Sequence, residues 1–435
     1  MAGFSGLRAS NDYSSDNTPE NWRELIMRQY PNGKALLTGF TTHLKKEETN
    51  FPTFNWLTKA FQAKEVAVTG IYTDAILDTA LNAGNSAAGT ILNVKMAEDA
   101  TTHFRPGHQI LLRDANYPLV DINARVIAVN PNGVSSFLQV SLLEADDAVG
   151  DGATYGLLSC DVAQLVGDVN PEAGEMPEAI SYEPVDQFNY TQIVRTPVKM
   201  SRTAMKSKFR FGEAYKEAKM DALEDHGEAL ERIFLFGVRS AGIGSNNLPM
   251  KTTGGMIPYI RDNASANVAD FRYDTTTAYS GKSWTEKGKD FLMNQLKLAF
   301  ENGDGQKACY AGSGALLGFN YLAEIYSHLN VVPGQTKWGM RYNTVICPWG
   351  ELEIVQHPLL SASSVNNSTL LIFDTSLMKY RYLSDTFFKK SIPLEQATHA
   401  AIDGIEEEWI TEAGLEMSFA NECAVLYGVG ETNVV

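Results

Sequence analysis

The sequence has little cysteine, and its acids outnumber its bases. Its 435 residues include four cysteines, 36 lysines and arginines, and 52 aspartates and glutamates, which gives a formal net charge of −16. The cysteines are far apart and form no CxxC pair, which argues against a disulfide framework and predicts reduced, buried thiols in a cytoplasmic setting. The acidic balance argues against broad nucleic-acid binding, which needs many bases to neutralise phosphates. It is compatible with a protein that surrounds nucleic acid without adhering to it.

The sequence also lacks long apolar runs. No segment approaches eighteen consecutive apolar residues, which excludes a membrane-spanning helix, and we expect no membrane partner. The first residues, MAGFSGLRASNDYSSDNTPENW, contain no apolar stretch typical of a signal peptide. The length itself predicts two or three domains.

The signatures of several enzyme classes are missing. The run from Gly242 to Gly244 lacks the third glycine of a dinucleotide-binding loop, and no GxxxxGK[ST] sequence is present. The run from Gly312 to Gly314 is not a GxSxG nucleophile elbow, and Ser313 is better placed as a helix cap. His103 and His108 have no cysteine or carboxylate nearby in the sequence that would complete a metal site. We therefore predict no enzyme, no catalytic residue, no metal and no cofactor.

Three other groups of ionisable residues have simpler interpretations. His226 lies within an amphipathic helical pattern and is expected to be a packed or rim residue. The runs Glu406–Glu408 and Asp146–Asp147 are expected to be solvated faces rather than paired catalytic carboxylates.

The most informative segment changes the sign of its charge in blocks. The first block, residues 167–188, contains only acids: Asp168, Glu172, Glu175, Glu178, Glu183 and Asp186. The second block, residues 189–210, contains only bases: Arg195, Lys199, Arg202, Lys206, Lys208 and Arg210. Three prolines in the acidic block favour an extended chain. The two blocks predict a two-stranded arm whose opposite charges face each other; the charges could equally face a neighbouring subunit, and a solvated loop is the third interpretation.

The basic block leads into a pattern that predicts one long helix over residues 212–236, ending at Gly237. Its apolar stripe is expected at Tyr215, Ala218, Ala222, Ala229, Ile233 and Phe236. About 25 residues at 1.5 Å each span roughly 38 Å, long enough for the backbone of a flat subunit. The alanines in the stripe indicate close packing against a sheet, and the acids of the helix, from Glu213 to Glu231, are expected on its other faces.

The remaining sequence divides into recognisable regions. Residues 1–50 are polar and have little apolar surface to bury alone. Short helical patterns occupy 53–82, and short β runs follow at 108–112, 124–129 and 137–142, the last two joined by a turn at 130–133.

A second compact region is expected from about residue 282. Ser283 and Glu286 form a capping-box pattern that opens a helix to Phe300. The expected elements after it alternate as in a small α/β domain: a strand at 307–311, a helix at 313–328, and strands at 343–346, 352–355 and 370–373. The sequence after residue 400 predicts closing strands that return to the sheet beside the long helix.

This order of parts resembles the major capsid protein of tailed bacteriophages, which has the Hong-Kong-ninety-seven-type fold. More narrowly, the chain resembles a podophage-type major capsid family over about residues 50–430. The runs that carry the resemblance are Phe51–Leu57, Asn189–Ile193 and Glu228–Gly237.

The resemblance implies an α+β fold with seven parts. These are an N-terminal arm (1–50), the start of a peripheral domain (51–87), an inserted β domain (88–164), an extended loop (165–210), the peripheral domain with its spine helix (211–281), an axial domain (282–400) and closing strands of the peripheral domain (401–435).

The implied function is a structural shell protein that forms hexamers and pentamers and closes an icosahedral or prolate head around double-stranded DNA without sequence-specific binding. A separate scaffolding protein, a portal and a decoration protein are the expected partners, with assembly in the host bacterial cytoplasm and the virion as destination. The charge-block residues, Arg195 to Arg210 and Glu172, Glu175, Glu178 and Glu183, are the candidate assembly interface. No set of lysine, asparagine and glutamate residues indicates cross-linking.

Two other functions remain open from the sequence. One is a shell protein of a cellular nanocompartment on the same fold. The other, from a different class, is a soluble hydrolase whose carboxylate site is assembled from distant residues.

Overall fold

The structure is a computed structural model that describes residues 44–59, 64–82, 86–146, 156–172, 176–206, 214–303, 305–325, 331–337, 340–390 and 404–435. The chain divides into two compact units. One unit, here called the β unit, is Lys59–Pro184, and the other, the main unit, combines Met1–Thr58 with Val185–Val435. The mixed α+β fold predicted from the sequence is confirmed.

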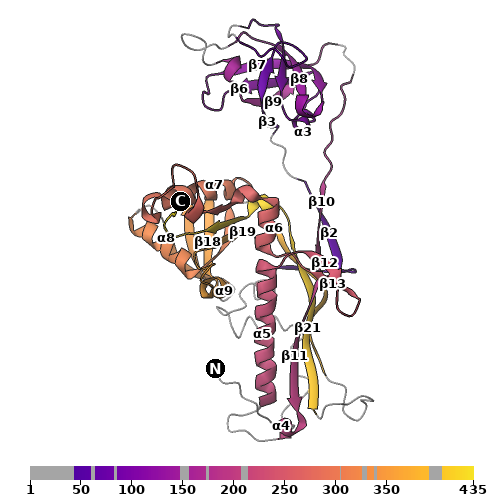
Figure 1. The fold of residues 1–435 in the computed structure, drawn as a ribbon, viewed down its shortest axis with the longest axis vertical. Coiled ribbons are helices and arrows are strands. Elements are labelled where there is room, and N and C mark those ends of the chain that lie inside the picture. The colour runs from indigo at the N-terminus through magenta and orange to yellow at the C-terminus, as the bar shows by residue number, and fades with distance from the viewer. Residues whose placement is uncertain are drawn as a thin grey trace. The chain divides into compact units, whose positions relative to one another are not determined.

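The β unit contains a seven-stranded antiparallel sheet (Figure 1). In sheet order its strands are β3 (Glu65–Ala67), β9 (Val162–Asp168), β6 (His108–Arg113), β7 (Asp121–Asn130), β8 (Phe137–Leu142), β5 (Ile91–Lys95) and β4 (Gly70–Tyr72). Strand β6 alternates buried and half-buried residues, with Ile110 and Leu112 fully buried, as expected for a strand with one face on a core. One short helix, α3 (Glu98–Thr101), accompanies the sheet. The three β runs and the turn after Asn130 predicted from the sequence are confirmed.

The β unit is longer than the predicted insertion at 88–164 and begins earlier. Strands β3 and β4 precede residue 88, and β9 continues past 164, because Val66, Ile71 and Leu165 contribute to the same apolar core. The unit is inserted between β2 (Thr53–Thr58) and β10 (Val185–Tyr190), which pair antiparallel as a two-stranded ribbon. The insertion therefore interrupts the extended segment rather than preceding it.

The short helical patterns predicted over 53–82 are wrong for the described part of that range: residues 53–58 form strand β2, and residues 64–82 contain strands β3 and β4 and no helix. Phe54 and Trp56 are buried, whereas Asn55 and Leu57 are exposed. This alternation has the two-residue period of a strand, and it was obscured because Trp56 and Leu57 also fit a short helical spacing. Ala60 and Phe61, the rest of that pattern, lie outside the described residues.

The main unit contains a four-stranded sheet with a long helix along one face (Figure 1). The strands, in sheet order, are β1 (Lys45–Glu48), β20 (Met378–Lys389), β21 (Gly404–Met417) and β11 (Gln192–Ser201). The short helix α4 (Arg202–Lys206) links β11 toward the long helix α5 (Ala214–Phe236). The predicted long helix is confirmed, and it is followed by a hairpin of β12 (Ser240–Ile243) and β13 (Pro249–Thr252).

The buried stripe of α5 lies one position away from the predicted one. The buried residues come in pairs four apart: Ala222 and Leu223, His226 and Gly227, Leu230 and Glu231, Phe234 and Leu235. Of the predicted stripe, Ala222 is buried, Ala229 and Ile233 are half-buried, and Phe236 is exposed. The sequence pattern was misread at Glu231, which is buried although it was expected among the acids on the other faces, whereas His226 is packed as one of its two predicted alternatives states.

The main unit also contains a seven-stranded mixed sheet. In sheet order its strands are β14 (Val268–Asp270), β22 (Ala424–Tyr427), β19 (Leu370–Phe373), β15 (Gln306–Ala311), β18 (Gly350–Gln356), β17 (Met340–Cys347) and β16 (Val331–Lys337). The accompanying helices are α6 (Met256–Asn263), α7 (Trp284–Phe300), α8 (Ser313–Ile325) and α9 (Pro358–Ala362). The predicted capping box is confirmed, since the Glu286 carboxylate accepts a 3.0 Å hydrogen bond from the Ser283 N–H.

Strand β22 does not follow the prediction for the closing strands. Strand β21 returns to the sheet beside α5, whereas β22 pairs with β14 and β19 in the seven-stranded sheet. The reason is that its residues Ala424, Val425 and Leu426 are all buried, a pattern that suits a central strand covered on both faces.

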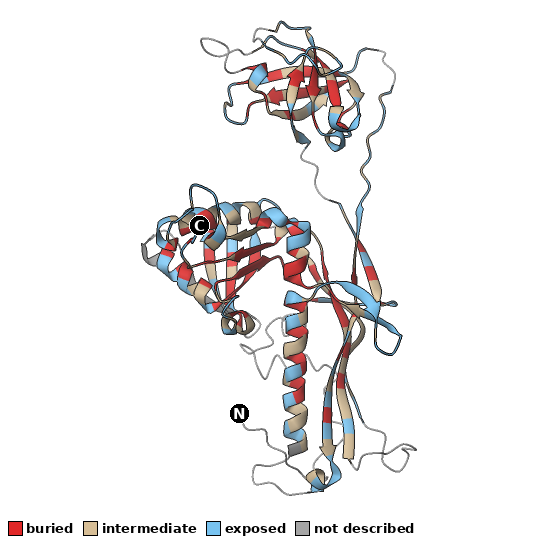
Figure 2. Cartoon of the chain, viewed as in Figure 1, coloured by how far each residue is buried: buried red, intermediate tan, exposed pale blue. Residues whose placement is uncertain are grey.

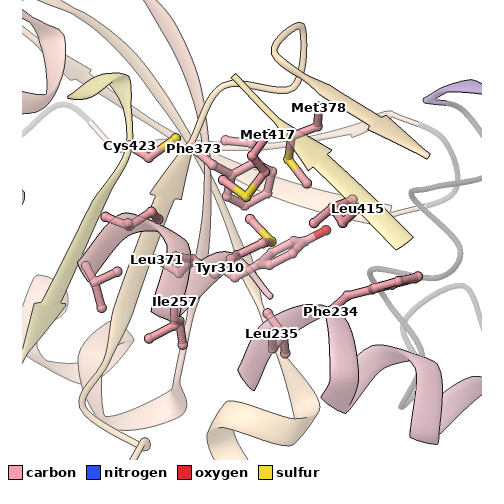
Figure 3. Close-up of a cluster of buried hydrophobic side chains, with 14 of the residues drawn as sticks. Phe234, Leu235, Ile257, Tyr310, Leu371, Phe373, Met378, Leu415, Met417 and Cys423 are labelled. Carbon is pink, nitrogen blue, oxygen red and sulfur yellow. The ribbon is translucent and has the colours of Figure 1, made fainter. Parts of the chain in front are cut away.

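One apolar core joins α5 to both sheets of the main unit (Figure 3). Phe234 and Leu235 from α5 pack with Tyr310 and Phe373 of the seven-stranded sheet and with Leu415 of the four-stranded sheet. This shared core fixes the helix and the two sheets as one packed body.

Candidate assembly surfaces

The basic residues of β11 lie on the sheet face that α5 does not cover. Val194 and Val198 are buried on the α5 side, whereas Arg195 and Lys199 alternate with them and are exposed. The period-two pattern of the strand therefore separates apolar packing from charge along the predicted basic block.

These bases pair with acids of β21 and not with the acidic block. Arg195 donates two hydrogen bonds to Glu408, of 2.7 Å from Nε and 2.6 Å from Nη2. Lys199 Nζ lies 2.9 Å from a carboxylate oxygen of Glu406, directly across the strand pair. Burial raises the pKa of Glu408, but hydrogen bonds from Arg195 and Lys389 outweigh this effect and hold the pKa below its ordinary value. The prediction that the acidic and basic blocks face each other is thus wrong for Arg195 and Lys199.

The run Glu406–Glu408 is consequently not a purely solvated face. Its two outer carboxylates accept from bases, and the middle one, Glu407, accepts from the Tyr215 hydroxyl of α5 on the other face of the sheet. Local sequence carries no signal for this pairing, because the partners are about two hundred residues apart.

Arg195 and Glu408 provide a test of this assignment. We expect Arg195→Glu to lower the free energy of unfolding by about 1 kcal/mol, because it removes an exposed ion pair and brings two acids together. The swap Arg195→Glu with Glu408→Arg should recover most of the loss in urea unfolding of the unassembled chain. Lys199→Glu is the matched control, and its effect should be smaller since both partners are about half exposed or more. A swap no more stable than Arg195→Glu would contradict the assignment.

The acidic block belongs mainly to the β unit. Asp168 accepts from Arg105 at 2.7 Å and lies 3.2 Å from His108 Nε2. Burial lowers the pKa of His108 despite the nearby Asp168 carboxylate. Glu172, Glu178 and Glu183 are exposed. They stay candidate contact residues.

The end of the basic block continues into α4. Arg202 and Lys206 are exposed there, and the last two bases, Lys208 and Arg210, lie outside the described residues. Glu175 of the acidic block also lies outside them. Asp186, the last acid of the acidic block, lies on β10 and accepts a 3.0 Å hydrogen bond from the side chain of Asn55 on β2.

Two buried polar contacts connect α5 to the rest of the main unit. The sequence predicted His226 as a packed or rim residue, and packing is confirmed, but it revealed neither the partners of His226 nor the burial of Glu231. His226 lies between Thr196 of β11, 2.9 Å from Nδ1, and Thr411 of β21, 2.7 Å from Nε2. Glu231 lies 2.6 Å from Nε2 of His357, and both side chains are fully buried. The signal available for Glu231 was its spacing of four from Gly227 and eight from Leu223, which places it on the buried stripe.

All four cysteines are buried thiols that form no disulfide. Burial raises the pKa of Cys347 to about 11 and of Cys423 to about 12. The expectation of reduced, buried thiols is confirmed. Among the described residues, no three His, Cys, Asp or Glu side chains are grouped to hold a metal ion. In the same part of the chain, no helix combines the length and apolar content needed to cross a membrane.

The main unit thus combines a long helix along a four-stranded sheet, a seven-stranded mixed sheet and two two-stranded ribbons. The model of the SU10 major capsid protein family matches residues 8–430, so the chain belongs to that family. It is a structural capsid shell protein of a phage, and the resemblance to tailed-phage major capsid proteins is confirmed.

Individual relatives are distant. The major capsid protein of Pseudomonas phage PaMx41 is 22% identical over 443 residues, covering 99% of this chain and 97% of its own. A solved structure from Mycobacterium phage Bobi is 10% identical with a TM-score of 0.42, covering 96% of this chain and 95% of that chain. The holo-SrpI encapsulin complex from Synechococcus elongatus is 11% identical with a TM-score of 0.38, covering 58% of this chain and 79% of that chain.

Proposed function

We propose that copies of this chain form hexamers and pentamers that close into an icosahedral or prolate head shell around double-stranded DNA. The observation that carries the proposal is the match of residues 8–430 to a major capsid protein family. Each contact between copies can be weak, because a closed symmetric shell repeats it many times. The net charge of −16 suits an inner wall that encloses DNA without binding it tightly.

The parts of the chain have distinct roles in this proposal. The arm at 1–50 reaches a neighbouring subunit, and its residues 45–48, as β1, also pair in parallel with β20 of their own subunit. The β2–β10 ribbon and the inserted β unit extend over an adjacent copy. Helix α5 is the spine, and the seven-stranded sheet forms the axial domain at capsomer centres.

The proposed partners are a separate scaffolding protein, a portal and a decoration protein, with assembly in the host bacterial cytoplasm. Electron microscopy of the expressed chain, alone and with the scaffold, should show shells. Shells large enough for a genome and filled with DNA support the phage head. Small shells that contain a cargo enzyme would instead support the nanocompartment, and a stable monomer or dimer with hydrolase activity would overturn both.

Reversal of charge in the basic block tests its role in assembly. We expect Arg202→Glu, Lys206→Glu and Lys208→Glu together to leave the monomer folded, as judged by circular dichroism, and to abolish shells in sedimentation. The same reversal at Arg261, Lys282 and Lys297 changes the net charge equally at exposed sites and should leave assembly intact. Normal shells from the first variant at moderate salt would rule out an assembly role for the block.

A further inference from the structure

The hairpin of β12 and β13 projects from the main unit with little cover from the described chain (Figures 1 and 2). All residues from Val238 to Met250 are exposed except Gly244, which is half-buried. Four large apolar side chains contribute to this surface: Val238 (59% exposed), Ile243 (72%), Leu248 (60%) and Met250 (56%). A concentration of exposed apolar side chains on one element marks a contact site.

The strand register concentrates the apolar side chains near the tip of the hairpin. Ile243 faces Pro249 across the strand pair, and Gly242 faces Met250 in the next position. Leu248 follows the turn immediately before Pro249. A two-stranded hairpin of this size is marginal by itself, so contact with a partner would stabilise it.

Side chains from both strands at the base of the hairpin contact the β2–β10 ribbon. Arg239 Nη1 donates a 2.6 Å hydrogen bond to the backbone oxygen of Phe188, and its guanidinium lies 4.0 Å from the centre of the Phe188 ring. On the other strand, Lys251 Nζ donates a 2.8 Å hydrogen bond to the Thr53 hydroxyl and lies 4.9 Å from the centre of the Tyr190 ring. Both strands are thus anchored to the β2–β10 ribbon, one through β10 and the other through β2 and β10.

Close backbone packing strengthens this anchor. The N–H of Gly255 donates a 2.7 Å hydrogen bond to the oxygen of Gly237 at the end of α5. A Cβ at Gly237 would lie 2.5 Å from the backbone oxygen of Ile233 and 2.7 Å from that of Thr253, so only glycine fits there. A rigid base presents the apolar tip in a fixed orientation, which lowers the entropy lost on binding.

The charge of the hairpin favours another copy of the chain as its partner. The segment 238–252 contains Arg239 and Lys251 and no acid, although the whole chain carries −16. Two such acidic molecules repel each other as wholes. The hairpin is apolar at its tip and has two bases and no acid, so two copies of the chain can make contact through it without bringing their acidic side chains together.

We propose that the β12–β13 hairpin docks on a second copy of this chain and buries Ile243, Leu248 and Met250 in the contact. The inference rests on the proposed shell assembly, which brings copies together. A scaffolding or decoration protein on the hairpin is an alternative outcome of the test.

Photo-cross-linking identifies what lies against the hairpin. The native cysteines are buried, so a benzophenone maleimide on Leu248→Cys of the full chain reports on this position. In purified, irradiated shells we expect a product of twice the 47.8 kDa chain mass, with the second peptide from another copy. A product with a different protein, or no product from labelled shells, would overturn the proposal.

Matched charge substitutions test the contact without a probe. We expect Leu248→Asp to reduce the chain recovered in shells at least tenfold, and Ser245→Asp, which adds the same charge to the turn but keeps the apolar side chains, to reduce it less than twofold. Both unassembled variants should melt like the parent, because both sites are exposed. Equal effects of the two variants would count against apolar docking. Failure of the parent to form shells even with its scaffold rejects the proposed function, whereas parent shells and an equal yield of Leu248→Asp shells reject only the hairpin contact.

Discussion

Replacing Glu231 with alanine should lower the free energy of unfolding by about 3 kcal/mol or more, the largest effect expected of a single substitution here. The Glu231 carboxylate lies 2.6 Å from Nε2 of His357, and neither side chain is exposed. The ring of His357 packs 5.0 Å from that of Tyr310. Removal of the carboxylate leaves a buried imidazole nitrogen without this partner, and an unsatisfied buried polar group costs its full desolvation free energy. Urea unfolding of the unassembled chain measures the loss.

Two further variants separate the buried contact from a general effect on α5. Glu228→Ala removes an acid one turn away that pairs with Arg232 at the surface, and it should cost about 0.5 kcal/mol or less. Replacing both Glu231 and His357 with leucine should recover much of the loss, since well-packed apolar pairs often match buried polar ones. Equal losses for Glu231→Ala and Glu228→Ala would contradict a special role for the buried contact.

The second large effect expected is a loss of stability in acid that depends on His226. Its side chain is fully buried, and burial lowers the pKa of the imidazole to about 4. The unfolded chain binds this proton near the ordinary value of about 6.5. Between these two values the unfolded state carries a proton that the folded state lacks, so stability is present above about pH 6.5 and falls as the pH decreases toward 4. The total loss is about 3 kcal/mol.

His226→Gln isolates this contribution from the titration of carboxylates. Glutamine offers one donor and one acceptor to Thr196 and Thr411 but does not titrate. The difference in unfolding free energy between pH 7 and pH 4.5 should therefore be smaller in the variant by about 2–3 kcal/mol. Identical pH dependence of parent and variant would show that His226 remains neutral in both states or charged in both.

The features that could be predicted from the sequence depend on residues that are close together in the chain. The Ser283–Glu286 capping box, the turn after Asn130 and the long helix α5 each depend on residues close in sequence. The family resemblance rested on runs of this kind as well, together with the order of the parts.

The features that were missed depend on contacts between distant residues. Glu408 was assigned to solvent because Arg195, its partner, enters from a strand far along the chain. Glu231 was assigned to a polar face because its partner His357, between β18 and α9, lies more than a hundred residues away in the sequence. The short strand β2 fitted a helical spacing as well as a strand spacing, and only its pairing with β10 decides between them.

The main unit should tolerate changes in the length of the segment inserted between β2 and β10. The chain leaves the ribbon at Thr58 and re-enters it at Val185, and these two residues are direct partners across the strands. Partners in an antiparallel pair lie about 5 Å apart, a gap that a tight turn closes in ordinary hairpins. The path of the chain through the main unit is thus independent of how many residues are inserted at this point. The end of the β2–β10 ribbon can therefore be closed by a tight turn or by a folded module such as the β unit.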